Sequence, residues 1–382
     1  MSRTVAAVVL VLAALTGCTS KDPKPGPTGS VTPVASQGAG EGALSLVSMS
    51  GNLEEGATDP RVDWVTPFER ATGCQVTLRQ AYSGQQVYDR LADGGVDGGL
   101  VPPEVADRLI RENHVAPVNT RLVESFKDLD PALRDQVKRD GRSYGVPFLW
   151  GAGQLMYDSQ RTAAPTSWGS VFDAAQNRPY RGRVVLPDSP LLLADAALYL
   201  KAHQRSLKIK DPFELTAVQL EAATALVEKS GVRNFWTDRT DVIEDFTTGD
   251  AVLGVAGTDV LDSLSRGGRP VAAGGPKEGA TAWLDTWMIA TGAPHPGCMY
   301  KWLDWSGSPQ TQTQAAEWRG AAPANPAACS TLPAGFCATY RVTDQAYRDR
   351  LTFVRAPARD CGGNQRTCTD WKDWIDAWAT VN

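Results

Sequence analysis

Side chains that commonly do chemistry are few in this sequence, and they form no familiar catalytic pattern. The chain has three histidines in 382 residues, His114, His203 and His295, which leaves little material for histidine-based catalysis or a zinc site. No G-x-S-x-G, H-E-x-x-H, P-loop or G-x-G-x-x-G motif stands at a strand-to-helix turn. The neighbouring carboxylates Glu54 and Glu55 are of a kind common on solvated loops, so alone they do not argue for glycosidase chemistry. We therefore expect a binding protein without catalytic residues or a metal.

The composition is that of a soluble globular protein. Hydrophobic residues make up 42% and charged residues 21% of the 382 residues. This length predicts two domains or lobes, because single domains most often have about 100–150 residues. The formal net charge of −5 argues against a nucleic-acid-binding protein, which usually shows a basic excess.

The N-terminal segment is typical of an exported lipoprotein. Arg3 is the only charge before an apolar run at residues 5–15, which is shorter than the roughly 20 residues of a membrane span and typical of a signal peptide. The run ends in Leu15-Thr16-Gly17-Cys18, which resembles a bacterial lipobox, so residues 1–17 would be removed and Cys18 lipidated. An ordinary secretory signal with a chance cysteine is the alternative.

The segment after Cys18 has the composition of a linker. Residues 18–42 are rich in glycine and proline and cannot bury a core, so we expect a disordered tether. Together with the lipobox, this predicts an extracytoplasmic protein anchored to the cell membrane by its lipid alone.

Six cysteines remain after Cys18, and an even number in an oxidising compartment indicates disulfides. Six cysteines can pair in fifteen ways. Sequence spacing favours two disulfides that close short loops and one long-range disulfide: Cys329–Cys337, Cys361–Cys368 and Cys74–Cys298.

Alternating apolar runs and amphipathic segments predict an α/β fold with a parallel arrangement of its first strands. The sequence Thr66-Pro67-Phe68-Glu69 has the pattern of a capping box, which predicts a helix start at Thr66 and a stop at Gly73. We expect strands at residues 43–49, 75–78, 99–101, 144–150, 155–157, 183–186, 251–256 and 283–290, and further helices at residues 85–92, 104–113, 191–200, 215–229 and 242–246.

Five segments carry motifs in a recognisable order. They are Asn52–Gly56, Phe68–Val76, Tyr144–Gly151, Thr166–Trp168 and Pro276–Thr286. The last four are similar to the patterns F-x-x-x-T-G-x-x-V, Y-x-[IV]-P-Y-x-W-G, x-S-W and P-K-E-G-x-x-x-W-x-D-S. In this order and spacing they resemble extracellular solute-binding lipoproteins of ABC importers, in the spermidine/putrescine-binding group. The six-cysteine pattern resembles the actinobacterial members.

The resemblance implies an α/β fold of the type 2 periplasmic-binding-protein class, a two-lobed clamshell with mixed central sheets and a ligand cleft between the lobes. It places residues 43–150 and 286–310 in the first lobe and residues 151–285 in the second. Residues 311–382 are expected to form a disulfide-bearing helical segment that packs on the lobes. We expect the chain to cross between the lobes near residues 149–153 and near residues 285–290.

The resemblance also implies how a ligand is held. Family members stack an aliphatic polyamine between aromatic rings and pair its ammonium groups with carboxylates. Trp283 and Asp285 match the family's W-x-D pattern, and Trp287 adds a ring two residues further on. The other candidate ligand-binding residues lie in segments that correspond to family site segments: Asn52, Glu54, Asp188, Ser189, Trp236, Thr237 and Asp238.

The sequence departs from the family pattern at four positions. Leu192 stands where a second carboxylate is expected, and Ala256 replaces an aromatic residue. Pro103 and Val105 replace a serine and a tyrosine. These departures concern the ligand and leave the expected fold unchanged.

The sequence thus predicts the substrate-binding component of an ABC importer for a small cationic solute, such as putrescine or spermidine. Its expected partners are the permease and ATPase subunits, and we expect a monomer that needs no cofactor. One alternative is the same fold for a sugar, an amino-acid derivative or a thiamine-like cation. Another is a lipid-anchored hydrolase or interaction protein of the cell envelope.

Overall fold

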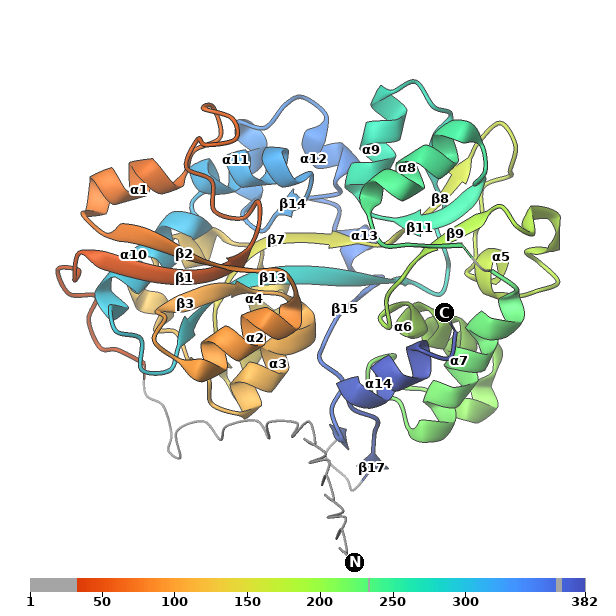
Figure 1. Cartoon of the computed structure of the whole chain (residues 1–382), viewed down its shortest axis with the longest axis horizontal. Helices are drawn as coiled ribbons and strands as arrows, with labels where there is room; N and C mark the ends of the chain where they lie inside the picture. Colours follow the sequence, from red (N-terminus) through yellow and green to blue (C-terminus); the bar gives the residue numbers. More distant parts are fainter. Residues whose placement is uncertain (1–32, 233, 362–365, 382) are drawn as a thin grey trace, which may run out of the picture.

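The chain folds into two α/β lobes that lie side by side and are joined by extended strands (Figure 1). The computed structural model describes residues 33–232, 234–361 and 366–381. Lobe 1 is built on an eight-stranded sheet and lobe 2 on a five-stranded sheet. This arrangement confirms the predicted α/β clamshell.

The sheet of lobe 1 contains both parallel and antiparallel neighbours. Its strands are β1 (Ala43–Met49), β2 (Gln75–Ala81), β3 (Gly98–Val101), β4 (Val115–Ala116), β7 (Val146–Ala152), β13 (Ala280–Ala290), β14 (Ala322–Pro323) and β15 (Leu351–Phe353). β1 pairs in parallel with β2 and β3, whereas β13 runs antiparallel to β3 and β7. Because β1 and β3 are parallel, the loops that follow them leave the same edge of the sheet.

Helices cover both faces of this sheet (Figure 1). Phe68 of α1 and Trp302 of α10 belong to the core on one face, and Val87 of α2 and Leu109 of α3 belong to the core on the other. The helices of lobe 1 and of the segment beside it are α1 (Val65–Thr72), α2 (Gly84–Asp93), α3 (Pro103–Arg111), α4 (Pro131–Gln136), α10 (Pro296–Gly307), α11 (Pro309–Arg319), α12 (Phe336–Thr339) and α13 (Gln345–Arg348). Short 3₁₀ turns lie at Thr120–Leu122, Glu124–Asp128 and Pro326–Ser330, and a hairpin joins β5 (Lys138–Arg139) and β6 (Arg142–Ser143).

Lobe 2 is also a mixed sheet covered by helices. Its strand order is β10-β9-β11-β8-β12, in which β11 is parallel to β9 and antiparallel to β8. The strands are β8 (Gln154–Asp158), β9 (Val184–Pro187), β10 (Asn234–Trp236), β11 (Leu253–Ala256) and β12 (Val271–Ala273). The helices are α5 (Gly169–Phe172), α6 (Leu192–His203), α7 (Ala217–Ser230), α8 (Arg239–Thr248), α9 (Thr258–Arg266) and α14 (Trp371–Trp378), with 3₁₀ turns at Arg178–Tyr180 and Arg205–Leu207 and a hairpin of β16 (Asp360–Cys361) and β17 (Arg366–Thr367).

Within the described residues, the chain passes between the two sheets three times. The first passage, from β7 to β8 at Gly153, lies where the sequence predicts it. The return passage lies at residues 274–279, ahead of the expected 285–290, because β13 belongs to the sheet of lobe 1 along its whole length. A third passage follows β15, after which Trp374 and Trp378 of α14 pack into the core of lobe 2.

The predicted capping box at Thr66 is wrong. Thr66 lies inside α1, and its N–H donates to Asp63 Oδ1 at 2.9 Å. Glu69 does not fold back on the helix start, because its Oε1 accepts a hydrogen bond of 2.7 Å from the N–H of Val76 in β2. The carboxylate thus links α1 to the next strand.

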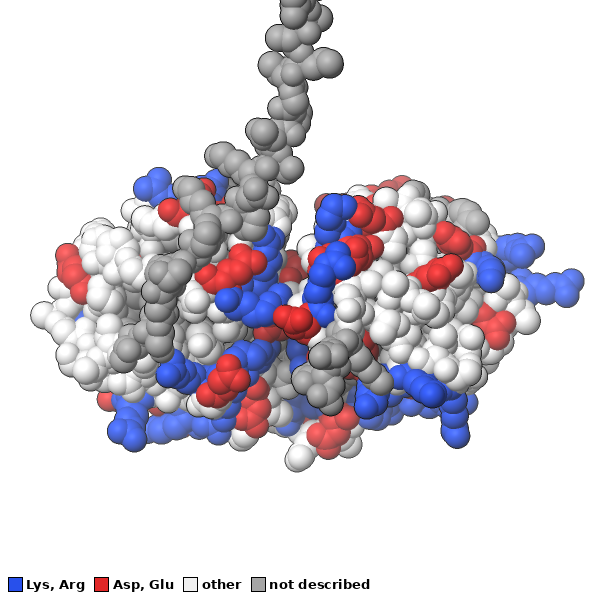
Figure 2. Space-filling view, turned by 90° about the horizontal axis from the view of Figure 1, so that it is seen from below, with Lys and Arg blue, Asp and Glu red and all other residues white. Residues whose placement is uncertain are grey.

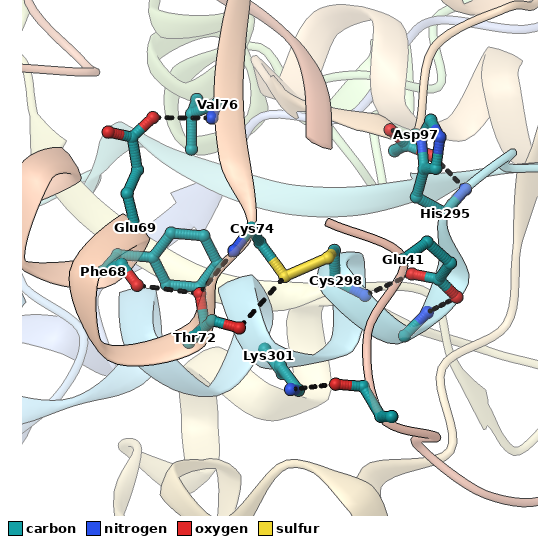
Figure 3. Close-up of a disulfide and its surroundings, with 12 residues drawn as sticks. Glu41, Phe68, Glu69, Thr72, Cys74, Val76, Asp97, His295, Cys298 and Lys301 are labelled. Carbon is teal, nitrogen blue, oxygen red and sulfur yellow. Dashed lines mark hydrogen bonds and ion pairs between the residues drawn. A yellow bond between two sulfur atoms is a disulfide. The ribbon is translucent and has the colours of Figure 1, made fainter. Parts of the chain in front are cut away.

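The three disulfides have the predicted pairing: Cys74–Cys298, Cys329–Cys337 and Cys361–Cys368. The first of them joins the residue before β2 to the first turn of α10 and lies within lobe 1 (Figure 3). It therefore fixes a covering helix to the edge of the sheet.

Residues 34–41 lie against lobe 1 beside this disulfide (Figure 3). The Glu41 carboxylate accepts hydrogen bonds from the N–H groups of Gly297 and Cys298, at 3.0 and 2.9 Å. Burial acts to raise the pKa of the Glu41 carboxyl, but these hydrogen bonds lower it below its ordinary value. Glu41 therefore caps the positive N-terminal end of α10 as a carboxylate.

Two further hydrogen bonds hold the backbone of this segment. Lys301 Nζ donates to the carbonyl of Ala39 at 2.5 Å, and Asn119 Nδ2 donates to the carbonyl of Val34 at 3.1 Å. The prediction of a disordered tether at residues 18–42 is therefore wrong for residues 34–41, because Val34 packs against the core of lobe 1 and the backbone carbonyls of Val34 and Ala39 accept hydrogen bonds. Cys18 lies outside the described residues. Every helix in the described part of the chain is too short or too polar to span a bilayer.

Candidate functional site

The edges at which the lobes face each other bring together segments that are distant in sequence. Gly320, which follows α11 of lobe 1, lies so close to α9 of lobe 2 that a Cβ at Gly320 would be 2.8 Å from the Asp259 Cβ. Residues from both lobes line a hollow at this junction: Trp150–Ala152, Gly257–Asp259, Trp283, Gly320–Ala322, Tyr340 and Tyr347. We call this hollow, with the adjoining Asp285, Glu104 and Arg319, the inner cleft.

Asp285 is the most unusual group of the inner cleft. Its side chain lies on β13 and is 9% exposed, yet it forms no hydrogen bond or ion pair with any described residue. Burial raises the pKa of the Asp285 carboxyl from 3.8 to about 7; Arg319 opposes this shift and Glu104 adds to it. A buried carboxylate without a partner is strongly disfavoured, so this site is suited to an incoming cation.

Glu104 comes from the first turn of α3, directly after β3. Its carboxylate lies across Gly84, the first residue of α2, where a Cβ would overlap Glu104 Oε1. Burial raises the pKa of the Glu104 carboxyl, and no hydrogen bond or ion pair joins this carboxylate to another described residue. Glycine at position 84 therefore makes room for a second carboxylate near Asp285.

The C-terminal end of α11 supplies an aromatic ring and a cation. The Arg319 guanidinium lies over Gly51, at 3.1 Å from the place of a Cβ there, and forms no ion pair with a described residue. Trp318 Nε1 donates to Glu54 Oε1 at 3.3 Å, which holds Glu54 in the loop after β1. The end of α11 thus packs against the loop that follows β1.

Lobe 2 contributes an ion pair to the inner cleft. Asp259 lies in the first turn of α9, and its Oδ2 is 3.4 Å from Arg239 Nη1. Burial raises the pKa of the Asp259 carboxyl, while Arg239 and Arg319 lower it. A charge of lobe 2 therefore acts on the same region as the charges of lobe 1.

Three predicted residues lie on β13, and the structure separates one of them from the cleft. The Trp283 ring lies on Gly151 of β7, with Nε1 3.0 Å from the place of a Cβ, and borders the inner cleft next to Asp285. Trp287 is fully buried and packs edge-on against Phe148 and Trp302. The strand has entered the core of lobe 1 by this point, so Trp287 has no open surface for a ligand.

The predicted residues of lobe 2 already have partners within the protein. Asp188 accepts a hydrogen bond of 2.7 Å from Trp378 Nε1, a contact that depends on the C-terminal helix. Trp236 Nε1 donates to the carbonyl of Val255 at 2.9 Å. Ser189 Oγ accepts a hydrogen bond from the N–H of Leu191, and Asp238 caps α8 by accepting one from the N–H of Thr240. Thr237 differs from these residues, because it is exposed between β10 and α8.

The two predicted residues after β1 have different surroundings. Asn52 is 2% exposed, and its Nδ2 donates a hydrogen bond to the carbonyl of Met49 at 3.3 Å. This bond ties the loop to the end of β1. Glu54 is 8% exposed and accepts from Trp318. Trp318 therefore holds Glu54 beside the end of α11, and Asn52 supports the loop that carries it.

Sequence reasoning missed Glu104, Arg319 and Asp259. A signal existed for Glu104, because it lies between Pro103 and Val105 at the end of a predicted strand, where ligand groups of α/β proteins gather. Arg319 and Asp259 are a helix-end residue and a helix-start residue, and no sequence pattern brings them together.

A second hollow between the lobes differs in its charges. Figure 2 shows Lys, Arg, Asp and Glu side chains on both sides of the furrow on the lower face. There Asp107 accepts a hydrogen bond of 2.6 Å from Arg139 Nε, and both residues line the hollow with Arg111, Glu214 and Arg355. Because its buried acid is paired, this hollow is a poorer cation site than the inner cleft. Among the described residues, no cluster of His, Cys, Asp and Glu is arranged to hold a metal ion.

The raised pKa of Asp285 predicts a stability effect that depends on pH. The Asp285 carboxyl binds its proton more tightly in the folded protein than in the unfolded chain. The free energy of unfolding therefore falls as pH rises through about 7. Asp285→Asn should raise the free energy of unfolding at pH 8, by at most about 4 kcal/mol, and by less than half as much at pH 5. Guanidinium unfolding at both pH values measures this.

Asp135→Asn, at an exposed position of α4, is the matched control and should show no such difference. Equal unfolding free energies for the wild type and Asp285→Asn at both pH values would contradict the assignment of a destabilising carboxylate.

Comparisons with known proteins agree with this architecture. Residues 63–332 match the family described as bacterial extracellular solute-binding protein. A putrescine/agmatine-binding protein of Pseudomonas aeruginosa is 24% identical over 290 residues, covering 70% of this chain and 77% of that protein. The spermidine/putrescine-binding periplasmic protein of Escherichia coli is 24% identical over 294 residues, covering 73% and 81%. A solved spermidine/putrescine ABC transporter substrate-binding protein of Streptococcus pneumoniae superposes with a TM-score of 0.69 at 16% identity, covering 89% of this chain and 97% of that one. This chain therefore belongs to the bacterial extracellular solute-binding protein family.

Proposed function

We propose that this protein is the substrate-binding component of an ABC importer and that it captures a polyamine, such as putrescine or spermidine, in the inner cleft. The observation that carries the ligand class is the buried Asp285 carboxylate, which has no partner within the described protein. An ammonium group supplies both the charge and the hydrogen bonds that this carboxylate lacks. The names of the relatives, which bind putrescine, agmatine or spermidine, support the same class.

The balance of charge around the inner cleft supports a dication. Among six charged groups in and beside the inner cleft, carboxylates outnumber guanidinium groups four to two, so these six groups carry a net charge of −2 when all of them are ionised. The groups are Glu54, Glu104, Asp259 and Asp285 against Arg239 and Arg319. A diamine carries two positive charges at neutral pH and therefore complements this region.

Trp283 supplies the apolar wall that an aliphatic diamine needs. Its ring is held flat by its contact with Gly151, where no side chain intervenes. A methylene chain can lie along this face while its ammonium group reaches Asp285, two residues further along β13. The exposed Trp318 ring lies beside the same region through its bond to Glu54.

Binding measurements on two variants test this proposal. Asp285→Asn should weaken putrescine or spermidine binding by about 30-fold or more, because a desolvated ammonium group loses its charged partner. Trp283→Ala should have a smaller effect, about 1–2 kcal/mol, through lost stacking and cation–π contact. Isothermal titration calorimetry measures both, with the exposed Asp135→Asn as the control.

Absence of binding heat with any polyamine at high micromolar protein would refute the polyamine proposal. Unchanged binding by Asp285→Asn would move the cation site elsewhere in the inner cleft, with Glu54 as the next candidate.

A solute that carries both an ammonium and a carboxylate group is the second candidate. The observation that favours it is Arg319, an exposed guanidinium without an ion pair near Asp285. If the solute is a diamine, Arg319→Gln should strengthen binding, because the variant removes a repulsive charge. If the solute is an amino-acid derivative, the same variant should weaken binding of that derivative by about tenfold or more, because it removes the partner of the carboxylate.

The finer features of the proposal concern location and partners. The lipobox supports an extracytoplasmic protein held at the membrane by lipidated Cys18. Acting as a monomer, it would deliver its solute to the permease, and the ATPase subunits would complete the importer on the cytoplasmic side. The relatives and the family are binding proteins of transport, which argues against the hydrolase alternative. Delivery of a solute involves no catalytic step and no cofactor.

The anchor has its own test. Cys18→Ala should leave the precursor uncleaved at this site and remove the protein from the membrane lipoprotein fraction, because the thiol is the point of lipid attachment. Immunoblotting of cell fractions, with and without an inhibitor of lipoprotein signal peptidase, measures this. Normal processing of the variant would contradict the lipobox and favour an ordinary secretory signal.

A further inference from the structure

Two carboxylates of the inner cleft, one buried and one half-buried, have no partner among the described residues, and they come from different elements. Asp285 lies on β13 and Glu104 at the start of α3, and α3 packs against β13. Neither side chain forms a hydrogen bond or an ion pair with another described residue, and Asp285 is 9% exposed. Val101, the last residue of β3, pairs with Thr286 of β13, so the residues that lead from β3 into α3 lie next to Asp285. The charge of Glu104 adds to the raised pKa of Asp285. Like charges in such a place share a proton or hold a cation between them.

The structure holds Glu104 in this position. Its carboxylate lies across Gly84, and a Cβ there would also contact Pro102 Cγ, at 3.3 Å. Ser83, which caps α2, is engaged with the N–H of Gln86 and does not bond to Glu104. Apart from its own backbone N–H, no described donor occupies the Glu104 carboxylate, so most of its hydrogen-bonding capacity is free.

The other charged groups around the pair do not neutralise it. Arg319 of α11 lowers the pKa of Asp285 by its charge but is not within ion-pair distance of either carboxylate. Asp259 and Arg239 of lobe 2 form an ion pair with each other. With the charge of Arg319 included, Glu104 and Asp285 therefore keep a net charge of −1 when both are ionised.

We infer that Glu104 and Asp285 together bind a single ammonium group of the solute, which makes Glu104 a second specificity-determining carboxylate. This inference rests on the proposed function and adds to it a residue that the family resemblance does not supply. A primary ammonium group has three N–H donors, so it can donate to both carboxylates and retain one donor for water or for lobe 2. Glu104 thereby takes the part of the carboxylate that is missing at Leu192, but from lobe 1 instead of lobe 2.

The pair also makes binding depend on pH. Protons and the ammonium group compete for the same two carboxylates, so affinity falls as pH decreases through the range in which the pair titrates. With one carboxylate removed, the raising effect of its charge on the other is lost. The remaining carboxyl then titrates at lower pH, and affinity changes less between pH 8 and pH 6.

Titration calorimetry of the purified protein with putrescine, at pH 6, 7 and 8, tests the inference. Glu104→Gln should weaken binding at pH 8 by about 10- to 100-fold, and it should flatten the pH dependence. Glu104→Asp keeps the charge on a shorter side chain and should lose less affinity than Glu104→Gln. Asp89→Asn, an exposed position on the neighbouring helix α2, is the matched control and should match the wild type.

The outcomes separate this inference from the proposed function. If the wild type binds putrescine and Glu104→Gln binds it equally well with the same pH dependence, the shared subsite is overturned and the proposed function stands. If the wild type binds no amine, the polyamine proposal fails and the subsite fails with it. Thermal melts of each variant establish whether it is folded. If Glu104→Gln is unfolded, Glu104→Asp takes its place in the test. Wild-type affinity and a wild-type pH profile in Glu104→Asp would then overturn the subsite.

Discussion

A buried carboxylate without a partner is the constraint on which the arrangement of the inner cleft depends. Asp285 is withdrawn from water on β13, and the protein supplies no donor to compensate for this. Glu104 increases the electrostatic cost, while Arg319 reduces it only from a distance. The unliganded cleft is thus less stable than a neutral one would be, and in the proposed function a bound cation would recover that free energy. Stability and affinity would then be linked through one group, because the feature that destabilises the empty protein would favour the ligand.

The strand that carries this group is held at both ends. At its start, the N–H and Oγ1 of Thr281 donate to the Asp195 carboxylate of α6, at 3.0 and 3.1 Å. Burial raises the pKa of Asp195 to about 7 in spite of these bonds. At its other end, β13 lies between β3 and β7 in the core of lobe 1. Trp283 and Asp285 therefore lie on a rigid segment, and any motion of one lobe against the other must occur in the three passages, at Gly153, at residues 274–279 and after β15.

The sequence predicted the fold better than the site, for a physical reason. Strand and helix positions follow from local periodicity, and the motifs around Trp150 and Trp283 identify the clamshell because they lie on β7 and β13, the two strands next to the first two passages between the lobes. A side chain's role depends on what approaches it from elsewhere. Asp188 has a carboxylate suited to a ligand, but Trp378 occupies it from the far end of the chain.

Burial and long-range proximity explain the other differences. By strand alternation Trp287 lies on the same side of β13 as Trp283 and Asp285, yet β13 enters the core of lobe 1 before residue 287. No local sequence pattern shows at which residue a strand enters the core. Arg319 is the last residue of α11, and Asp259 lies in the first turn of α9. The two residues are near each other only because these two helix ends lie at the junction of the lobes. The disulfides were accessible to sequence reasoning because six cysteines at two short spacings leave one remaining pair.

The distribution of anchoring and binding groups gives the two lobes different roles. Lobe 1 carries the N-terminal segment, held by Glu41 and Lys301 beside the Cys74–Cys298 disulfide (Figure 3). It also carries Trp283, Asp285, Glu104 and Glu54, whereas lobe 2 brings the Asp259–Arg239 pair to the inner cleft. A cationic solute held first by lobe 1 would present its remaining charge to Asp259, which is half-buried and already forms an ion pair with Arg239. If the solute is such a cation, its attraction to Asp259 acts between the lobes, so the electrostatic interaction that would select the solute would also draw lobe 2 toward lobe 1.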